Sequence, residues 1–412
     1  MSCAKTELCI FDTAMPQVVV DNACFEEIFP VNTITGKNET DVEFNIIGSN
    51  TDYLDLNDTL LYVELKVQSV DKGELKDLAA AADVTPTNFM FHTLFKDALL
   101  SFNNEKIEGG NNVYAHKAML DTIINYGSDT KDTNLTSIGY DSDDADRKAW
   151  IAESKTFSMC GSLQLDFFDQ PKYLLPGVNV HLRLQRNKSS FCLKAPTGTD
   201  LKLLLLEARL YVRRVKVEQS VLMGHQIGLN TQNAIYPYRK SEVVSYTVAT
   251  GSLSFYKDQI FGDLRLPKFV LVCFQKASQY NGAIVEDCAK FEHCNATSIT
   301  LSKNNDYRET YTQDFSTSNY CKSYVTSLIR NMGHLDKNLN CGITMADFKN
   351  TYPFFTFVLA PDFEVHQTQL PKQGNLRLDI KFASALEKPT SVIVYGIFDH
   401  ALQINKNRTI II

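Results

Sequence analysis

The chain has 412 residues, 44% of them hydrophobic and 22% charged, and its formal net charge is −7 at pH 7. This size and composition fit a globular protein with two or three ordinary domains, or with two large β domains. The acidic balance and the dispersed Lys and Arg residues exclude a protein that attracts nucleic acid by charge alone.

Three further features bear on where the chain is made. The ten cysteines are too sparse for a disulfide scaffold. The first residues lack the basic start and apolar core of a signal peptide, and no segment reaches the roughly 20 apolar residues of a membrane span. We therefore expect a protein that is made in soluble form, in a reducing compartment.

In chain order, residues 1–35 are irregular, because the segments MPQVVV and FPVN interrupt any regular pattern. We interpret them as an N-terminal arm or a first edge segment. Strands then begin at 41–47 and at 53–70, where apolar residues alternate with polar ones. In the second strand the alternation is clearest from Leu61 to Val67, which indicates a strand with one buried face.

Residues 90–108 predict a strand that ends in a turn at NNE, and a helix follows at 111–127. The apolar stripe of this helix consists of Val113, Leu120, Ile123 and Ile124. Lys117 falls within the stripe, so we expect its amine to extend to solvent or to lie at the edge. The next segment, 128–149, is polar and acidic, and we expect an exposed insert that folding does not require.

Strands resume at 162–168 and 177–187, and the longest one covers 203–220. Within it the apolar positions shift by one residue, which predicts a bulge near Arg213–Arg214. Residues 221–240 break the β pattern, and we interpret them as a short helix or loop that links two units.

Strand-like segments then continue to the C terminus. NLRLDIKF alternates, so Leu378 and Ile380 are expected in a core. VIVYGIF is apolar on both phases, which predicts a central strand covered on both sides, and we expect the two segments to form a C-terminal hairpin.

Roughly eight strand candidates lie on each side of residue 230, and no βαβ alternation occurs. This pattern predicts an all-β protein of two antiparallel sandwiches, of Greek-key or jelly-roll type. We divide the chain into an arm at 1–35, a first sandwich at 36–220, a linker at 221–234 and a second sandwich at 235–412.

Known catalytic and phosphate-binding motifs do not occur in the sequence, but two segments could hold a metal ion. In CAKFEHC, Cys288, His293 and Cys294 are close together, with Cys273 and Cys321 farther away. The paired spacing of structural zinc sites is missing, so buried thiols in a loop are the simpler interpretation. The segment DSDDADRK (141–148) has the carboxylate density of a calcium loop without its glycine or distal glutamate, and a solvated acidic loop is the simpler interpretation.

The histidines are isolated in sequence, and His181 and His366 are expected at the surface or at the edge of a cleft. Trp150 lies beside the acidic insert; it indicates either an aromatic binding loop or, more simply, packing at the base of a loop. We assign no catalytic, cofactor-binding or metal-binding residue and no cofactor. The protein is not expected to be an enzyme.

Several segments together resemble one family. KQGNLRLDIKFASALEKPTSVIVYGIFDHALQINKNR (372–408) closely resembles the end of the major capsid proteins of Polinton (Maverick) elements and adintoviruses. YLDLNDTLLYVELKV resembles their early strand pair, and FMFHTLFKDALLSFNNEKIEGGNNVYAHKAMLDTIINYG resembles their strand–helix segment. IYPYRKSEVVSYTVATGSLSFYKDQIFGDLRLPKFVLVCF resembles the start of their second half. The acidic insert and the stretch 273–321 depart from the family pattern.

The resemblance implies a double jelly-roll, hexon-like fold of two eight-stranded sandwiches with short helices in loops. It also implies a homotrimer, a pseudo-hexagonal capsomer and an icosahedral shell, with penton and minor capsid proteins as further partners and the virion as the location. No sequence-specific nucleic-acid binding and no membrane span are implied. The alternative is a double-sandwich spike or minor capsid protein that binds a carbohydrate or a receptor.

Overall fold

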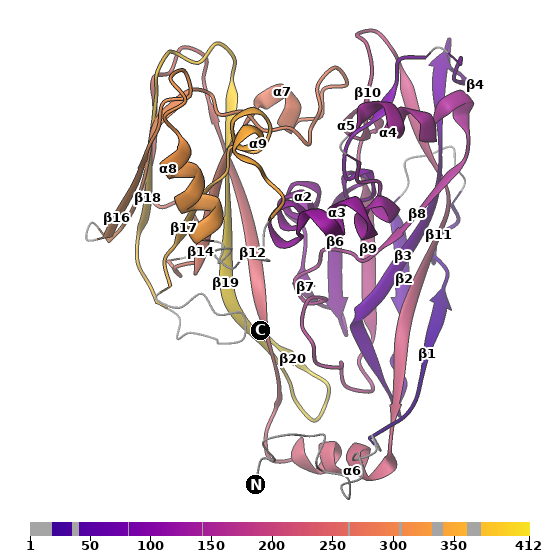
Figure 1. The fold of residues 1–412 in the computed structure, drawn as a ribbon. Helices are drawn as coiled ribbons and strands as arrows, with labels where there is room; N and C mark the ends of the chain where they lie inside the picture. Colours follow the sequence, from indigo (N-terminus) through magenta and orange to yellow (C-terminus); the bar gives the residue numbers. More distant parts are fainter. Residues whose placement is uncertain are drawn as a thin grey trace, which may run out of the picture.

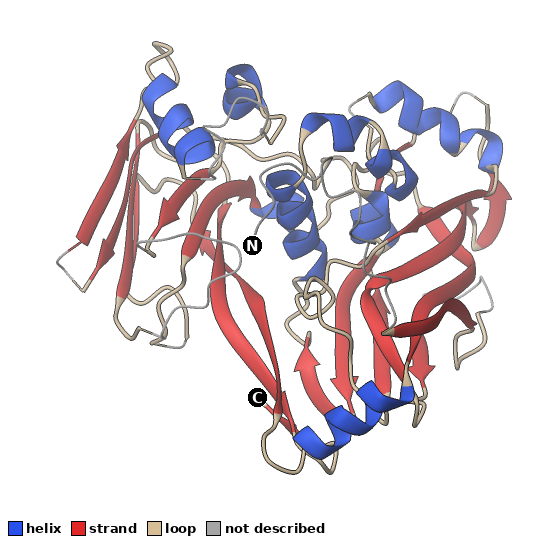
Figure 2. Cartoon of the chain, turned by 60° about the horizontal axis from the view of Figure 1, so that its bottom comes forward, coloured by secondary structure: helices blue, strands red, loops and turns tan. Residues whose placement is uncertain are grey.

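The computed structural model describes residues 19–34, 41–80, 82–141, 143–262, 264–304, 307–331, 341–360 and 372–412. Two β-sandwiches stand side by side, and helix α6 (Gln219–Gly228) runs across their lower end in Figure 1. Most of the other helices lie between the sandwiches or at the opposite end, as Figure 2 shows from a second direction.

The strands of the first sandwich are β1 (Val20–Ile28), β2 (Val42–Ile46), β3 (Asp52–Asp71), β4 (Glu74–Asp77), β5 (Thr85–Pro86), β6 (Phe95–Phe102), β7 (Glu105–Glu108), β8 (Phe157–Gly161), β9 (Val180–Arg186), β10 (Leu193–Lys194) and β11 (Leu201–Val217). Those of the second are β12 (Ala234–Val248), β13 (Ser254–Lys257), β14 (Phe269–Lys276), β15 (Ala296–Lys303), β16 (Tyr307–Thr312), β17 (Phe355–Val358), β18 (Leu376–Phe382), β19 (Thr390–Ile404) and β20 (Ile410–Ile411). The other helices are α1 (Met90–Thr93), α2 (Tyr114–Asn125), α3 (Ser128–Asp132), η2 (Asn134–Ile138), α4 (Asp144–Trp150), η3 (Ala152–Ser154), α5 (Ser189–Cys192), α7 (Ala277–Tyr280), α8 (Cys321–Tyr324), η4 (Val325–Arg330) and α9 (Met345–Asn350).

The two sandwiches repeat one strand order. In the first, sheet 1A runs β1-β11-β3-β8, with β4 also paired to β3, and sheet 1B runs β2-β9-β6-β7. In the second, sheet 2A runs β12-β19-β14-β17, with β20 on β19, and sheet 2B runs β13-β18-β15-β16. Every pairing in these sheets is antiparallel. The fold is therefore two tandem antiparallel jelly rolls, as the sequence analysis expected.

The long strand β11 shows how local sequence sets the faces of sheet 1A. Its pairing with β3 shifts register between Tyr211 and Arg213, which confirms the predicted bulge. A second shift lies between Leu205 and Glu207, and the sequence pattern did not reveal it. Because each bulge reverses the side-chain phase, the buried positions change from Leu203 and Leu205 to Ala208 and Leu210, and then to Val215.

The beginning of the chain favours one of the two interpretations of residues 1–35. The edge segment fits and the arm does not for Val20–Ile28, because β1 pairs with β11 over these residues and forms the edge of sheet 1A. β1 is mostly exposed, and an edge strand of this kind lacks the apolar alternation that reveals a central strand. We now propose that the first jelly roll begins by Val20. Helix α6 occupies the predicted link between the units, and β12 begins at Ala234.

Two other predicted elements differ from the structure. Residues 162–168 form no strand, although Leu163, Leu165 and Phe167 are buried, so their alternation reflects burial of a loop. β18 and β19 do not form a hairpin, because β18 pairs with β13 and β15 in sheet 2B whereas β19 lies in sheet 2A. The predicted burial is nevertheless correct, since Leu378 and Ile380 are inaccessible to solvent.

Candidate functional site

The cysteine-bearing segment does not converge on one point. Cys273 lies in β14 and Cys288 in the following loop; both are buried, and burial raises the pKa of each thiol well above its usual value. Cys321 is exposed at the start of α8. Within the residues that the structure describes, no three His, Cys, Asp or Glu side chains gather so that they could hold a metal ion.

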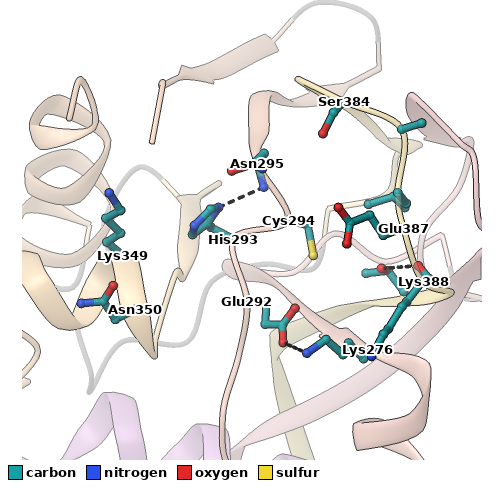
Figure 3. Close-up of a pocket in the computed structure, with 13 residues that line it drawn as sticks. Lys276, Glu292, His293, Cys294, Asn295, Lys349, Asn350, Ser384, Glu387 and Lys388 are labelled. Carbon is teal, nitrogen blue, oxygen red and sulfur yellow. Dashed lines mark hydrogen bonds and ion pairs between the residues drawn. The ribbon is translucent and has the colours of Figure 1, made fainter. Parts of the chain in front are cut away.

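His293 and Cys294 line a pocket of about 520 Å³ among the loops at one end of the second jelly roll (Figure 3). The His293 ring stacks on Phe315 with centroids 4.2 Å apart, and its Nδ1 accepts a hydrogen bond from the Asn295 amide. Burial raises the pKa of Cys294 to about 12, so its thiol stays protonated at neutral pH. Figure 3 shows that thiol directed away from the imidazole, so the two residues do not form a nucleophile–base pair.

The acidic insert is largely helical and partly buried, which contradicts the exposed loop that we expected. Its aspartates are engaged locally: Asp143 caps α4 by accepting a hydrogen bond from the Ala145 amide at 2.8 Å, and Asp144 pairs with buried Arg147. Arg147 also donates to the carbonyl of Pro86. The insert is therefore a packed part of the first jelly roll, and the sequence did not reveal this because its buried residues are interspersed with exposed aspartates.

Lys131 extends from this insert to the second jelly roll. Its amine donates to the carbonyl of Ile123, near the end of α2, at 2.7 Å and to that of Cys341 at 2.6 Å. Burial lowers the pKa of this lysine to about 8. The insert thus helps to hold the two jelly rolls together.

The remaining residues that the sequence singled out have ordinary positions. His181 lies on β9, partly exposed, with its Nε2 3.9 Å from Glu43. Trp150 is partly buried and packs against the first core, which supports the simpler of the two interpretations. His366 lies outside the described residues. Among the described helices, none is long and apolar enough to cross a lipid bilayer.

The seam between the jelly rolls contains the most unusual chemistry of the described residues. Lys117, which we expected at the edge of α2, is buried, and its amine contacts Glu108 at 2.6 Å and Asp166 at 2.7 Å. A third hydrogen bond goes to the carbonyl of Gln164 at 3.1 Å. All three donors of the ammonium group are therefore used, as a buried charge requires.

The same cluster crosses into the second jelly roll. The second carboxylate oxygen of Asp166 accepts a hydrogen bond from the Ser241 amide of β12 at 2.8 Å. The Tyr395 hydroxyl of β19 donates to Asp121 of α2 and lies 3.1 Å from the Ser241 hydroxyl. These contacts fix the orientation of one sandwich relative to the other through directional bonds.

Charge in this cluster is unevenly balanced. Burial, with Asp166 nearby, raises the pKa of Glu108 to about 7, although Lys117 acts in the opposite direction. Burial likewise raises the pKa of Asp121 to about 7. For Lys117, burial opposes the charge, but Asp166 and Glu108 outweigh it and raise the pKa. The seam therefore keeps its lysine charged while two of its carboxyl groups titrate near neutral pH.

Apolar packing completes the seam, because α2 contributes to both cores. Tyr114 and Ala118 belong to the core of the first jelly roll, whereas Met119 and Ile123 belong to that of the second. In Figure 1 α2 lies between the two sandwiches, beside β12, and its Asp121 reaches Tyr395 of β19. One feature of the sequence could have revealed that α2 packs against both cores. Lys117 lies inside its wide apolar stripe, a pattern typical of a helix without an exposed face.

Comparisons with known proteins agree with this architecture. No known family model matches the chain. An uncharacterized protein of Caenorhabditis elegans is 24% identical over 405 residues, which cover 89% of this chain and 92% of that protein. Among solved structures, a chain of the Sputnik virophage has a TM-score of 0.65 and 11% identity over 100% of this chain and 92% of its own. The major capsid protein of mavirus has a TM-score of 0.51 and 10% identity over 100% and 95% of the two chains. Likeness at this level shows that the protein has the double jelly-roll fold of these proteins.

Proposed function

We propose that the protein is a major capsid protein that forms trimeric, pseudo-hexagonal capsomers and then an icosahedral shell. The observation that carries the proposal is the repeated jelly roll held by a buried seam, in a chain similar over its whole length to the mavirus major capsid protein. A rigid block with two equivalent halves suits tiling, because three chains supply six similar units around one axis.

The finer identity follows the sequence resemblance. We infer that the gene belongs to a Polinton (Maverick) element or an adintovirus, and that the protein acts in the virion beside penton and minor capsid proteins. A relative of nearly the same extent in a nematode fits an element carried in an animal genome. The sequence segments that resemble this group support the assignment.

The test is to express the full chain, measure its mass by light scattering and image it by electron microscopy. We expect a trimer, with three times the chain mass of 46.5 kDa, and particles with a hexagonal outline. A protein that stays monomeric at micromolar concentration, across pH and salt, would contradict the proposal.

A further inference from the structure

Sheets 1A and 2A have the same strand order, yet their outer faces have different surroundings. The outer face of sheet 2A is covered within the chain, since Tyr395 of β19 contacts Asp121 of α2. The outer face of sheet 1A lies on the side of the first jelly roll away from the second, as Figure 1 shows for β1 and β11. We define this outer face of sheet 1A by Phe25, Leu60, Tyr62, Arg209 and Tyr211, which paired registers place in adjacent rows, and by Phe29, whose ring lies under Arg209.

This face has the composition of a protein-binding surface. Phe25 is 56% and Phe29 60% exposed. Arg209 lies over the Phe29 ring, 5.6 Å from its centroid, and pairs with Glu27 at 2.8 Å. Tyr211 donates to the same carboxylate at 3.0 Å. Aromatic residues and arginine held in place by neighbours are enriched at interfaces that form after folding.

Helix α2, which covers the outer face of sheet 2A, indicates what kind of segment covers the outer face of sheet 1A. Helix α2 lies in the connection from β7 to β8. The equivalent connection of the second jelly roll, from β16 to β17, contains α8, η4 and α9, and α8 with η4 is its first helical segment, as α2 is after β7. Within Cys321–Arg330, Val325 is 39% exposed, so this helical segment has an apolar residue available for a partner.

Resting on the capsid function proposed above, we propose that the outer face of sheet 1A binds the α8–η4 segment of a second copy of this chain. The contact between copies then repeats the contact of α2 with sheet 2A inside each copy. It is head to tail, because a different surface is used on each side. Such contacts close into a ring when the rotation between successive copies closes, which a trimer requires.

The two sides of the proposed contact differ in charge. The α8–η4 segment carries Lys322 and Arg330 and no acidic residue. The outer face of sheet 1A carries charges of both signs, namely the carboxylates of Glu27, Asp58, Glu64 and Glu207 and the cationic groups of Lys66, Lys202, Arg209 and Arg213. Its carboxylates can pair with a basic helix from the second copy.

The first test replaces exposed aromatics on this face. We expect Phe25→Glu/Phe29→Glu to lose the trimer by light scattering while keeping its melting temperature within a few degrees, since both side chains are exposed. Met223→Glu/Ile227→Glu on α6, with side chains 52% and 68% exposed, is the matched control and should stay trimeric. If the parent is trimeric and the sheet 1A variant is too, the proposed face is wrong although the capsid function stands. A monomeric parent would overturn the capsid function itself, and this contact with it.

The second test identifies the partner segment. Cys321 on α8 is exposed, whereas Cys24 is also exposed but alternates with Phe25 and so lies on the other side of β1. In a Cys3→Ser/Cys9→Ser/Cys24→Ser background that also carries Phe25→Cys, a short bismaleimide should join position 25 of one copy to Cys321 of the next, giving a covalent trimer on a denaturing gel. Cys321→Ser in this background, or the same background with Phe25 unchanged, should abolish it. Products that persist in Cys321→Ser, between position 25 of two copies, would overturn the head-to-tail contact.

Discussion

The central strands of sheets 1A and 2A occupy equivalent places but are buried differently. β19 is buried at every position from Thr390 to Phe398, whereas β11 alternates between buried and partly exposed residues. The difference comes from α2, which covers sheet 2A and has no equivalent over sheet 1A within the described residues. A face that is covered from the moment of folding can be apolar, whereas a face that meets solvent before assembly needs polar residues.

The largest expected effect concerns the inner faces, where the two jelly rolls are alike. Leu210 of β11 and Leu378 of β18 are both inaccessible to solvent. Leu210→Asp and Leu378→Asp should each bury an unpaired charge at a cost of several kcal/mol, a large share of a typical stability of about 5–15 kcal/mol. Both variants should be insoluble or unfolded by circular dichroism.

The matched control for this pair is Arg377→Asp. Arg377 is partly exposed, lies 3.3 Å from Asp258 and stacks over Tyr256. Loss of these surface contacts should cost about 1 kcal/mol or less in a denaturant titration. If Arg377→Asp unfolds while Leu378→Asp melts like the parent, the assigned register of β18 is inverted.

The next prediction separates the outer faces. Ile393 shares the α2-facing side of β19 with Tyr395 and is inaccessible, so Ile393→Asp should cost several kcal/mol. Tyr62, on the outer face of sheet 1A, is partly exposed, and Tyr62→Asp should cost about 1 kcal/mol or less. Urea unfolding of both variants measures the contrast. Equal destabilisation would mean that sheet 1A is covered within the chain as well.

Removing the lysine of the seam should have a smaller but clear effect. Lys117→Ala leaves Glu108 and Asp166 buried without their cation, and breaking a buried pair in this way costs about 3–5 kcal/mol. Lys66→Ala is the control, because its ion pair with Asp77 is solvent-exposed. A Lys117→Ala variant with parental stability would show that the carboxyl groups are neutral without the lysine.

The smallest expected effect is a pH dependence of stability. The pKa values of Glu108 and Asp121 are raised from their ordinary values of 4.5 and 3.8 to about 7 in the folded state. Between those limits the folded state holds more protons than the unfolded one, so these groups make stability fall as pH rises from about 4 to 7. Asp121→Asn should flatten this decline in denaturant titrations at several pH values. An unchanged slope would contradict the assignment to Asp121.

The sequence predicted much of the difference in burial between the strands of sheets 1A and 2A, because the alternation of apolar and polar residues indicates which sides of a strand are buried. The pattern of VIVYGIF correctly predicted that β19 is covered on both sides, and the phase shift in β11 correctly predicted its bulge near Arg213. The pattern gave a wrong prediction at 162–168, where the residues are buried but form a loop. It also missed β1, which is a strand but is mostly exposed. It also failed for Lys117, because its partners Glu108 and Asp166 are brought to it only by the tertiary fold.

The proposed contacts between copies could not be predicted from the sequence, for a related reason. Phe25 and Phe29 lie in a segment that looked irregular, and only pairing with β11 places them beside Arg209. The equivalence of α2 and α8 likewise depends on strand order, since the two helices share no sequence pattern. Local patterns identify what is buried inside a chain, whereas an assembly surface depends on how exposed residues are brought together.

The most direct test of the central claim is hydroxyl-radical footprinting of the proposed trimer and of a variant designed to be monomeric, Val325→Glu, which leaves sheet 1A unchanged. Tyr395 should be unlabelled in both, because α2 covers it within each chain. Phe29 and Tyr211 should be labelled in the monomer and protected in the trimer. Equal labelling of Phe29 and Tyr211 in both forms would contradict the account that a second copy covers the outer face of sheet 1A.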